Sequence, residues 1–295
     1  MPADRTTELL GRLHDGVAAI VTGDDWRRYL DVARRFHNYS WWNTIAILTQ
    51  RPEATRIAGY RAWRRLGRQV RKGEVGIRIL APCTYRRLVV DDDTDEATQV
   101  TQLRGFKVVS VFDIAQTDGD PLPEQPPVEV LDGPAPGLLH HQLASLIRAE
   151  GFTFLTGPMP DHHPGALGVT DFSTRTVTVK RGLPAAQRAK TTAHEFAHVL
   201  LHEPGPGVPA RARQEIEAES VAYVVMGALG VVADAYSFSY VTSWSGSDIE
   251  AVQATGERVL DCARRILDRL RATHLATCRI FLDVPARQCE AAACG

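Results

Sequence analysis

Apolar positions recur with a helical period near the start of the chain and change to short β-branched runs further on. The pattern predicts three helices before residue 51, with Ser40 able to cap the third helix and Pro52 ending it. Short apolar runs between residues 75 and 112 predict strands. The expected helices are Glu8–Val21, Trp26–Phe36 and Trp41–Gln50, and the expected strands are Val75–Pro82, Tyr85–Val90 and Leu103–Phe112.

The helical period returns after a stretch that neither helix nor central strand can tolerate. Pro121–Gly137 holds six prolines in 17 residues, which predicts a linker. Beyond it we expect the helices Leu138–Glu150, Ala185–His202, Arg211–Val232 and Ser247–Arg271, and a hairpin of Ala166–Thr170 with Thr174–Lys180. The predicted fold class is therefore α+β. We expect an α+β domain over 1–120, a linker over 121–137, a mostly helical domain with a small sheet over 138–275, and a tail of unknown role over 276–295.

Composition excludes several classes of protein. The 34 Lys and Arg residues balance 35 Asp and Glu residues, which argues against an acidic DNA mimic and a uniformly basic chromatin protein. The longest apolar run, Val221–Ala233, has 13 residues and is too short for a membrane span of roughly 20. Five cysteines without a CxxC pair indicate reduced thiols. We expect a cytoplasmic protein that does not contact a membrane.

The most specific motif is His194-Glu195-Phe196-Ala197-His198, an HExxH sequence inside a predicted helix. Residues four apart on a helix differ by about 40° in direction, so both imidazoles can bind one metal ion. Glu195 lies beside them and can act as general base toward a zinc-activated water. The motif therefore predicts a Zn²⁺ site with Glu195 as its catalytic residue.

A catalytic zinc ion normally takes three protein ligands, so one ligand is still needed. His202 lies about 12 Å along the helix axis from His194 and is too far away to share the ion. Glu215 and Glu219 share one face of the next helix, whose alanines allow close packing. We predict Glu215 as third ligand and Glu219 as the carboxylate that orients a zinc-bound imidazole, with the reverse assignment left open.

These residues resemble a known family. HEFAHVLLH followed by EIEAESVAYVV is similar to the zincin metallopeptidases of the ImmA/IrrE class, and the resemblance covers roughly residues 138–272. It implies metal-assisted hydrolysis of an unidentified protein substrate, with the predicted hairpin edging the substrate cleft. No motif selects the group that stabilises the oxyanion, and the candidates are Tyr223, Tyr236, Tyr240, His162 and His163.

The N-terminal half carries a concentrated positive charge. Eleven basic and only two acidic residues lie between Arg51 and Leu88, and aromatic residues are interleaved with them. Basic side chains that contact the phosphate backbone, together with aromatic rings that stack on unpaired bases, are typical of proteins that bind single-stranded DNA. Core packing is the favoured role for Trp41, and Trp63 has Leu66 three residues away as a packing partner. The candidate DNA-binding residues are Arg61, Arg64, Arg65, Arg68, Arg71, Lys72, Tyr60, Trp63, Tyr39 and Trp42.

The amino-acid sequence of this N-terminal region strongly resembles the N-terminal domain of ArdC-like antirestriction proteins. The resemblance rests on RFHNYSWWNTIAILTQRPEATRIAGYRAWRRLGRQVRKGEVGIRILAP and on VFDIAQTDGDPLP, and it covers about residues 5–125. It implies a DNA-binding domain coupled to a zincin-type domain, protecting incoming mobile-element DNA. Two alternatives stay open: a protective DNA-binding protein whose zinc is structural, and a regulatory protease that cleaves a repressor.

Overall fold

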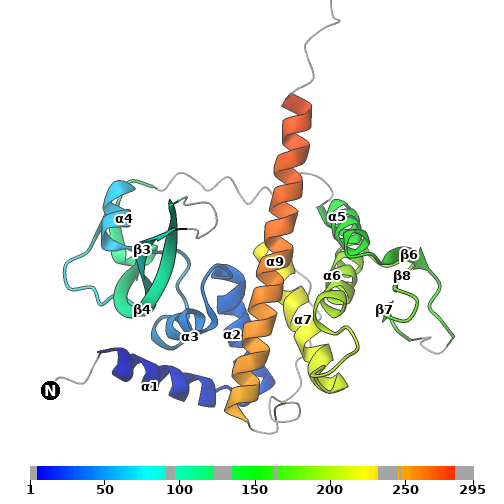
Figure 1. The fold of residues 1–295 in the computed structure, drawn as a ribbon, viewed down its shortest axis with the longest axis horizontal. Helices are drawn as coiled ribbons and strands as arrows, with labels where there is room; N and C mark the ends of the chain where they lie inside the picture. Colours follow the sequence, from blue (N-terminus) through cyan, green and yellow to red (C-terminus); the bar gives the residue numbers. More distant parts are fainter. Residues whose placement is uncertain are drawn as a thin grey trace, which may run out of the picture.

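The computed structural model describes residues 5–90, 97–121, 135–161, 165–231, 245 and 248–282. It confirms the α+β class with two small three-stranded sheets among helices (Figure 1). The acidic run 91–96, most of the expected linker and the tail beyond Leu282 lie outside the described residues. No helix in the described part of the chain combines the length and apolarity needed to cross a membrane.

The first half begins with three helices and continues into a β-ribbon. Its helices are α1 (Arg5–Ala18), α2 (Gly23–Arg35), α3 (Trp41–Gln50) and α4 (Tyr60–Arg65). Its strands are β1 (Ile57–Gly59), β2 (Arg68–Val70), β3 (Ile77–Val90), β4 (Ala97–Asp113) and β5 (Thr117–Gly119), with a 3-10 turn, η1 (Ile114–Gln116), before β5. The predicted cap of α3 is confirmed, because the Ser40 side chain accepts a hydrogen bond from the Asn43 backbone N–H.

Two predicted strands are one strand in the structure. Val75–Pro82 and Tyr85–Val90 join as β3, which pairs with β4 through a register shift between Cys83 and Thr84. The free edge of β3 is closed by α3: the Asn43 amide makes both backbone hydrogen bonds of Leu80, at 2.8 and 2.9 Å. Gln50 does the same for Arg78. Side-chain amides thus replace the strand that this edge lacks.

The second half places a small sheet beside the HExxH helix. Its strands are β6 (Thr153–Gly157), β7 (Gly168–Asp171) and β8 (Thr176–Lys180), in the order β6-β8-β7, so the predicted hairpin is present and β7 forms an edge. Its helices are α5 (Ala135–Ala149), α6 (Ala185–Leu201), α7 (Arg211–Ala228) and α9 (Ile249–Leu282). Helix α5 begins within the last three residues of the expected linker.

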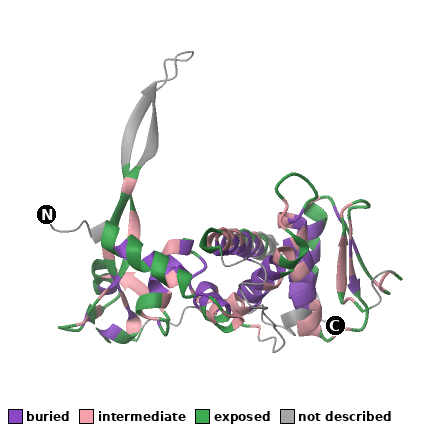
Figure 2. Cartoon of the chain, turned by 90° about the horizontal axis from the view of Figure 1, so that it is seen from below, coloured by how far each residue is buried: buried purple, intermediate pink, exposed green. Residues whose placement is uncertain are grey.

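The helices of both halves share one hydrophobic core (Figure 2). The Trp26 indole N–H of α2 donates to the Ser220 hydroxyl of α7 at 2.9 Å, and the Tyr29 hydroxyl donates to the Gly256 carbonyl of α9 at 3.3 Å. All four residues are buried. Figure 1 shows α9 running between the β3–β4 ribbon and the α5–α6 pair. The N-terminal helices are therefore packed directly against the helix that carries Glu215.

Candidate metal centre

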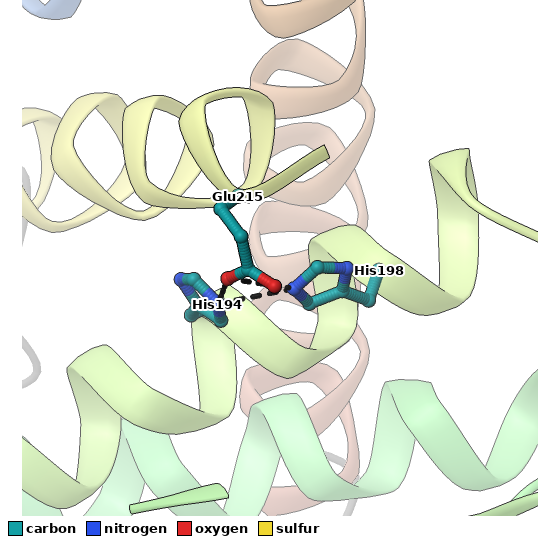
Figure 3. A group of neighbouring side chains, drawn as sticks. All are labelled: His194, His198 and Glu215. Carbon is teal, nitrogen blue, oxygen red and sulfur yellow. Dashed lines mark hydrogen bonds and ion pairs between the residues drawn. The ribbon is translucent and has the colours of Figure 1, made fainter. Parts of the chain in front are cut away.

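Two imidazoles and one carboxylate converge between α6 and α7 (Figure 3). The Nε2 atoms of His194 and His198 are 3.1 Å apart, and the Glu215 Oε2 lies 3.4 Å from the first and 3.7 Å from the second. Donors about 2.0–2.1 Å from one tetrahedral ion lie roughly 3.3 Å from each other. The three side chains therefore fit a single divalent ion, and the structure brings all three predicted ligands together.

Glu219 of α7, the carboxylate expected to orient a ligand imidazole, contacts His194. Glu219 Oε2 is 3.3 Å from His194 Nδ1, and Glu219 Oε1 is 2.8 Å from the Lys190 ammonium. Burial lowers the pKa of His194, but the hydrogen bonds that its ring donates to the Glu215 and Glu219 carboxylates outweigh burial and raise that pKa to about 9. Two carboxylates around one imidazole thus create a site that favours a positive charge.

Glu195, which follows His194 in the chain, is held by strand β7. Its Oε2 accepts a 2.7 Å hydrogen bond from the Thr170 hydroxyl, and its side chain is buried. Gly168 allows this approach, because a Cβ there would lie 2.6 Å from Glu195 Oε1 and 2.7 Å from Thr191 Cγ2. Both ligand histidines and Glu195 line one cavity of about 450 Å³, together with β7 and the start of α7. An edge strand beside the cavity suits an extended peptide.

A third histidine contacts the site, and the sequence argument placed it at the helix end or in the substrate cleft. His202 is the C-cap residue of α6 and lines the same cavity, and its Nδ1 lies 2.9 Å from His198 Nδ1, a contact that was not predicted. Its Nε2 is 3.0 Å from Oε2 of Glu217, which is fully buried. Burial would raise the pKa of Glu217, but the His202 hydrogen bond and the Arg258 and Arg213 charges keep it below its usual value. The sequence signal that could have indicated this buried carboxylate was the position of Glu217 between two apolar residues, Ile216 and Ala218.

The candidates for oxyanion stabilisation are not supported by the described structure. The Tyr223 hydroxyl donates to Asp31 Oδ1 of α2 at 2.6 Å, and Tyr223 does not line the cavity. The other four candidates, His162, His163, Tyr236 and Tyr240, lie outside the described residues.

The basic candidates of the N-terminal half fall into two groups. Arg68 donates to Thr117 and to the Gly119 carbonyl, while Arg71 pairs with Glu74 and Asp118. These contacts engage both guanidinium groups within the protein, and the DNA-binding role expected for Arg68 and Arg71 stays a prediction. The side chains of the other four are exposed and have no hydrogen bond or ion pair with the described part of the chain: Arg61, Arg64, Arg65 and Lys72.

The aromatic candidates also divide. Trp63 is 2% exposed and its indole N–H donates to the Phe112 carbonyl, so its expected stacking role is wrong because the ring is part of the core. Tyr60 is 44% exposed, whereas Tyr39 and Trp42 are half-buried against the core. Sequence reasoning missed Phe106, which is 56% exposed on β4. The signal was its position between two basic residues, Arg104 and Lys107.

Two family models match the chain, one in each half. The N-terminal domain of anti-restriction factor ArdC matches residues 4–112, and the IrrE N-terminal-like domain matches residues 155–229. An uncharacterized protein of Bacillus anthracis is 23% identical over 286 residues, covering 84% of this chain and 48% of that protein. The chain thus spans about half the length of this relative.

Two crystal structures of the antirestriction protein ArdC from the R388 plasmid also align with this chain. The metal-free structure is 21% identical with a TM-score of 0.48, covering 79% of this chain and 84% of that one. The Mn(II)-bound structure is 20% identical with a TM-score of 0.45, covering 82% of this chain and 97% of that one. The family assignment comes from the two domain models, which match in the order that the sequence predicted.

Proposed function

This chain is an ArdC-like two-domain protein, and from that organisation we propose that it is a zinc metallopeptidase that also binds single-stranded DNA. One observation carries the enzymatic part: His194, His198 and Glu215 form a three-ligand group beside a buried carboxylate, Glu195, on an open cavity. A purely structural metal site closes its fourth position and has no use for that carboxylate. We place the activity in the cytoplasm, where incoming single strands of mobile elements meet restriction enzymes.

The roles of the residues follow from their positions. A bound zinc ion would supply Lewis-acid polarisation of a peptide carbonyl and would acidify a water molecule. The Thr170 hydrogen bond to Oε2 holds the Glu195 carboxylate in place, and Glu195 takes the proton from the attacking water and then gives it to the leaving amine. Strand β7 positions an extended peptide along its free edge.

The variant Glu195→Gln tests the enzymatic part. Glutamine keeps the size and the Thr170 hydrogen bond but cannot accept the proton, so cleavage of an internally quenched peptide library should fall by about 10²–10⁴-fold. The zinc content, measured by mass spectrometry of the metal, should stay at one per chain. Unchanged cleavage would exclude Glu195 as the base, whereas zinc-free wild-type protein would contradict the site itself.

The DNA-binding part rests on the exposed cations and rings of the N-terminal half. Three exposed arginines on α4, Arg61, Arg64 and Arg65, lie beside exposed Tyr60. Phosphate neutralisation and base stacking are the interactions that bind single strands without reading sequence. The full chain should therefore bind labelled oligo-dT more tightly than a duplex of equal length. Equal or tighter duplex binding would contradict this part alone.

A further inference from the structure

A third histidine extends the metal centre into the protein interior. His202 is the residue at the C-terminal cap of α6, one turn beyond His198, and its side chain is fully buried. It contacts two partners, His198 through Nδ1 at 2.9 Å and the Glu217 carboxylate through Nε2 at 3.0 Å. These contacts form a continuous row from a metal ligand to a carboxylate with no exposed surface.

Proton counting allows one arrangement for this row. His198 presents Nε2 toward Glu215 and the ion, so a neutral His198 must carry its proton on Nδ1. At 2.9 Å one of the two facing Nδ1 atoms donates and the other accepts, so His198 donates to His202. His202 then carries its proton on Nε2 and donates it to Glu217, which only accepts when it is ionised. Each contact has one donor and one acceptor.

We infer that His202 and Glu217 are positioning residues that fix the orientation and the tautomer of the metal ligand His198. The inference rests on the metal site of the proposed function and does not depend on peptide hydrolysis. The other ligand has an equivalent arrangement, because His194 Nδ1 contacts Glu219, which is held by Lys190. Both imidazoles therefore have their Nδ1 atoms occupied and their Nε2 atoms turned to the ion.

Two arginines keep the end of this row charged. The Glu217 carboxylate is 3.0 Å from the Arg213 Nε and 3.0 Å from the Arg258 Nε, and Arg258 also donates to the Leu201 carbonyl at 2.9 Å. A buried carboxylate with such partners stays ionised and accepts hydrogen bonds. Arg258 belongs to α9, beyond residues 155–229 that match the IrrE N-terminal-like domain. Helix α9 thus contributes to the metal centre through Glu217.

The test is zinc affinity, measured by competition with a chelator, in the full-length protein. His202→Phe fills the space but neither accepts nor donates, and loss of an outer hydrogen bond of this kind should weaken zinc binding by about 10–100-fold. His202→Gln offers one acceptor and one donor, so it should recover much of that loss. The matched control is His37→Phe, which removes another buried histidine, bonded to Arg271, far from the ion.

A merely structural role for His202 gives a different result. It would lower the melting temperature of zinc-free His202→Phe and His37→Phe alike, without a selective effect on zinc. Zinc affinity equal to wild type in folded His202→Phe would overturn the inference. If that variant does not fold, wild-type zinc affinity in Glu217→Gln, which removes the charge that holds the His202 proton, would overturn it instead. Nitrogen NMR of the zinc-loaded wild type adds a direct readout, because a proton on His202 Nδ1 would also overturn it. Failure of the wild type to bind zinc would instead contradict the proposed function.

Discussion

At the scale of single residues, the missing side chain of Gly168 determines how close β7 comes to Glu195. A Cβ at this position would lie 2.6 Å from Glu195 Oε1, inside van der Waals contact. Gly168→Ala should therefore displace the Glu195 side chain, reduce peptide cleavage by at least about 10-fold, and cost about 1–3 kcal/mol of unfolding free energy through overpacking. Cleavage rates and urea unfolding check both effects. Gly157→Ala on β6, where a Cβ meets nothing within 4 Å, is the control and should change neither.

The division of the arginines into free and engaged groups gives a second prediction at this scale. Arg64→Ala should flatten the log–log salt dependence of oligo-dT binding by about 0.7, which is one phosphate contact on a single strand, and should leave stability unchanged. Arg68→Ala should instead lower the unfolding free energy by about 1–3 kcal/mol, because Arg68 joins β2 to β5 through hydrogen bonds. Equal salt slopes for Arg64→Ala and wild type would contradict this division.

At the scale of elements, the α5–α6 contact contains a buried histidine that should make stability depend on pH. His140 donates to the Thr192 hydroxyl at 2.7 Å, and burial together with the nearby Arg188 charge lowers its pKa to about 4. The unfolded chain has a histidine pKa of about 6.5 and binds the proton first, so stability is lost as the pH falls from about 6.5 toward 4.

The variant His140→Gln should remove that loss. The decrease in unfolding free energy between pH 7 and pH 5, measured by urea denaturation of zinc-free protein, should be smaller in the variant by roughly 1–2 kcal/mol. His141→Gln replaces the exposed neighbour on the same helix and should behave like wild type. An equal decrease in His140→Gln and wild type would show that His140 titrates normally.

Elements with their own local signals could be predicted from the sequence, and elements that depend on distant partners could not. Helix α3 has a cap, a period and a terminating proline, and its bounds match the expected ones. Strands β1 and β2 have three residues each, and they form by pairing with β4 and β5, which lie much later in the chain. The same limit applies to the site: the HExxH spacing predicted that His194 and His198 lie together, whereas the His202–Glu217 contact requires the packing of α6 on α7.

At the scale of the whole molecule, the two halves are joined through Trp41 and Gly256. Trp41 is 2% exposed, as the sequence favoured, and its six-membered ring lies against Gly256 of α9 so closely that an added Cβ would overlap it. Gly256→Ala should therefore destabilise the full chain by at least about 1–3 kcal/mol, although alanine is the better helix former by about 1 kcal/mol.

Thermal unfolding followed by circular dichroism checks this prediction. Because the halves share one core, Gly256→Ala should shift a single transition to lower temperature rather than separate two transitions. Gly11→Ala in α1, where a Cβ meets nothing within 4 Å, is the control and should not lower the melting temperature. Two transitions in the wild type, with only one affected by Gly256→Ala, would show that the halves unfold independently.

The central claim is that His194, His198 and Glu215 bind one zinc ion between α6 and α7. Anomalous diffraction at the zinc edge, from a crystal of the zinc-loaded full-length protein, tests it most directly. We expect one peak about 2.0–2.2 Å from the Nε2 atoms of both histidines and from a Glu215 carboxylate oxygen. A peak coordinated by Glu219 or by an Nδ1 atom, or no peak between these helices, would contradict it.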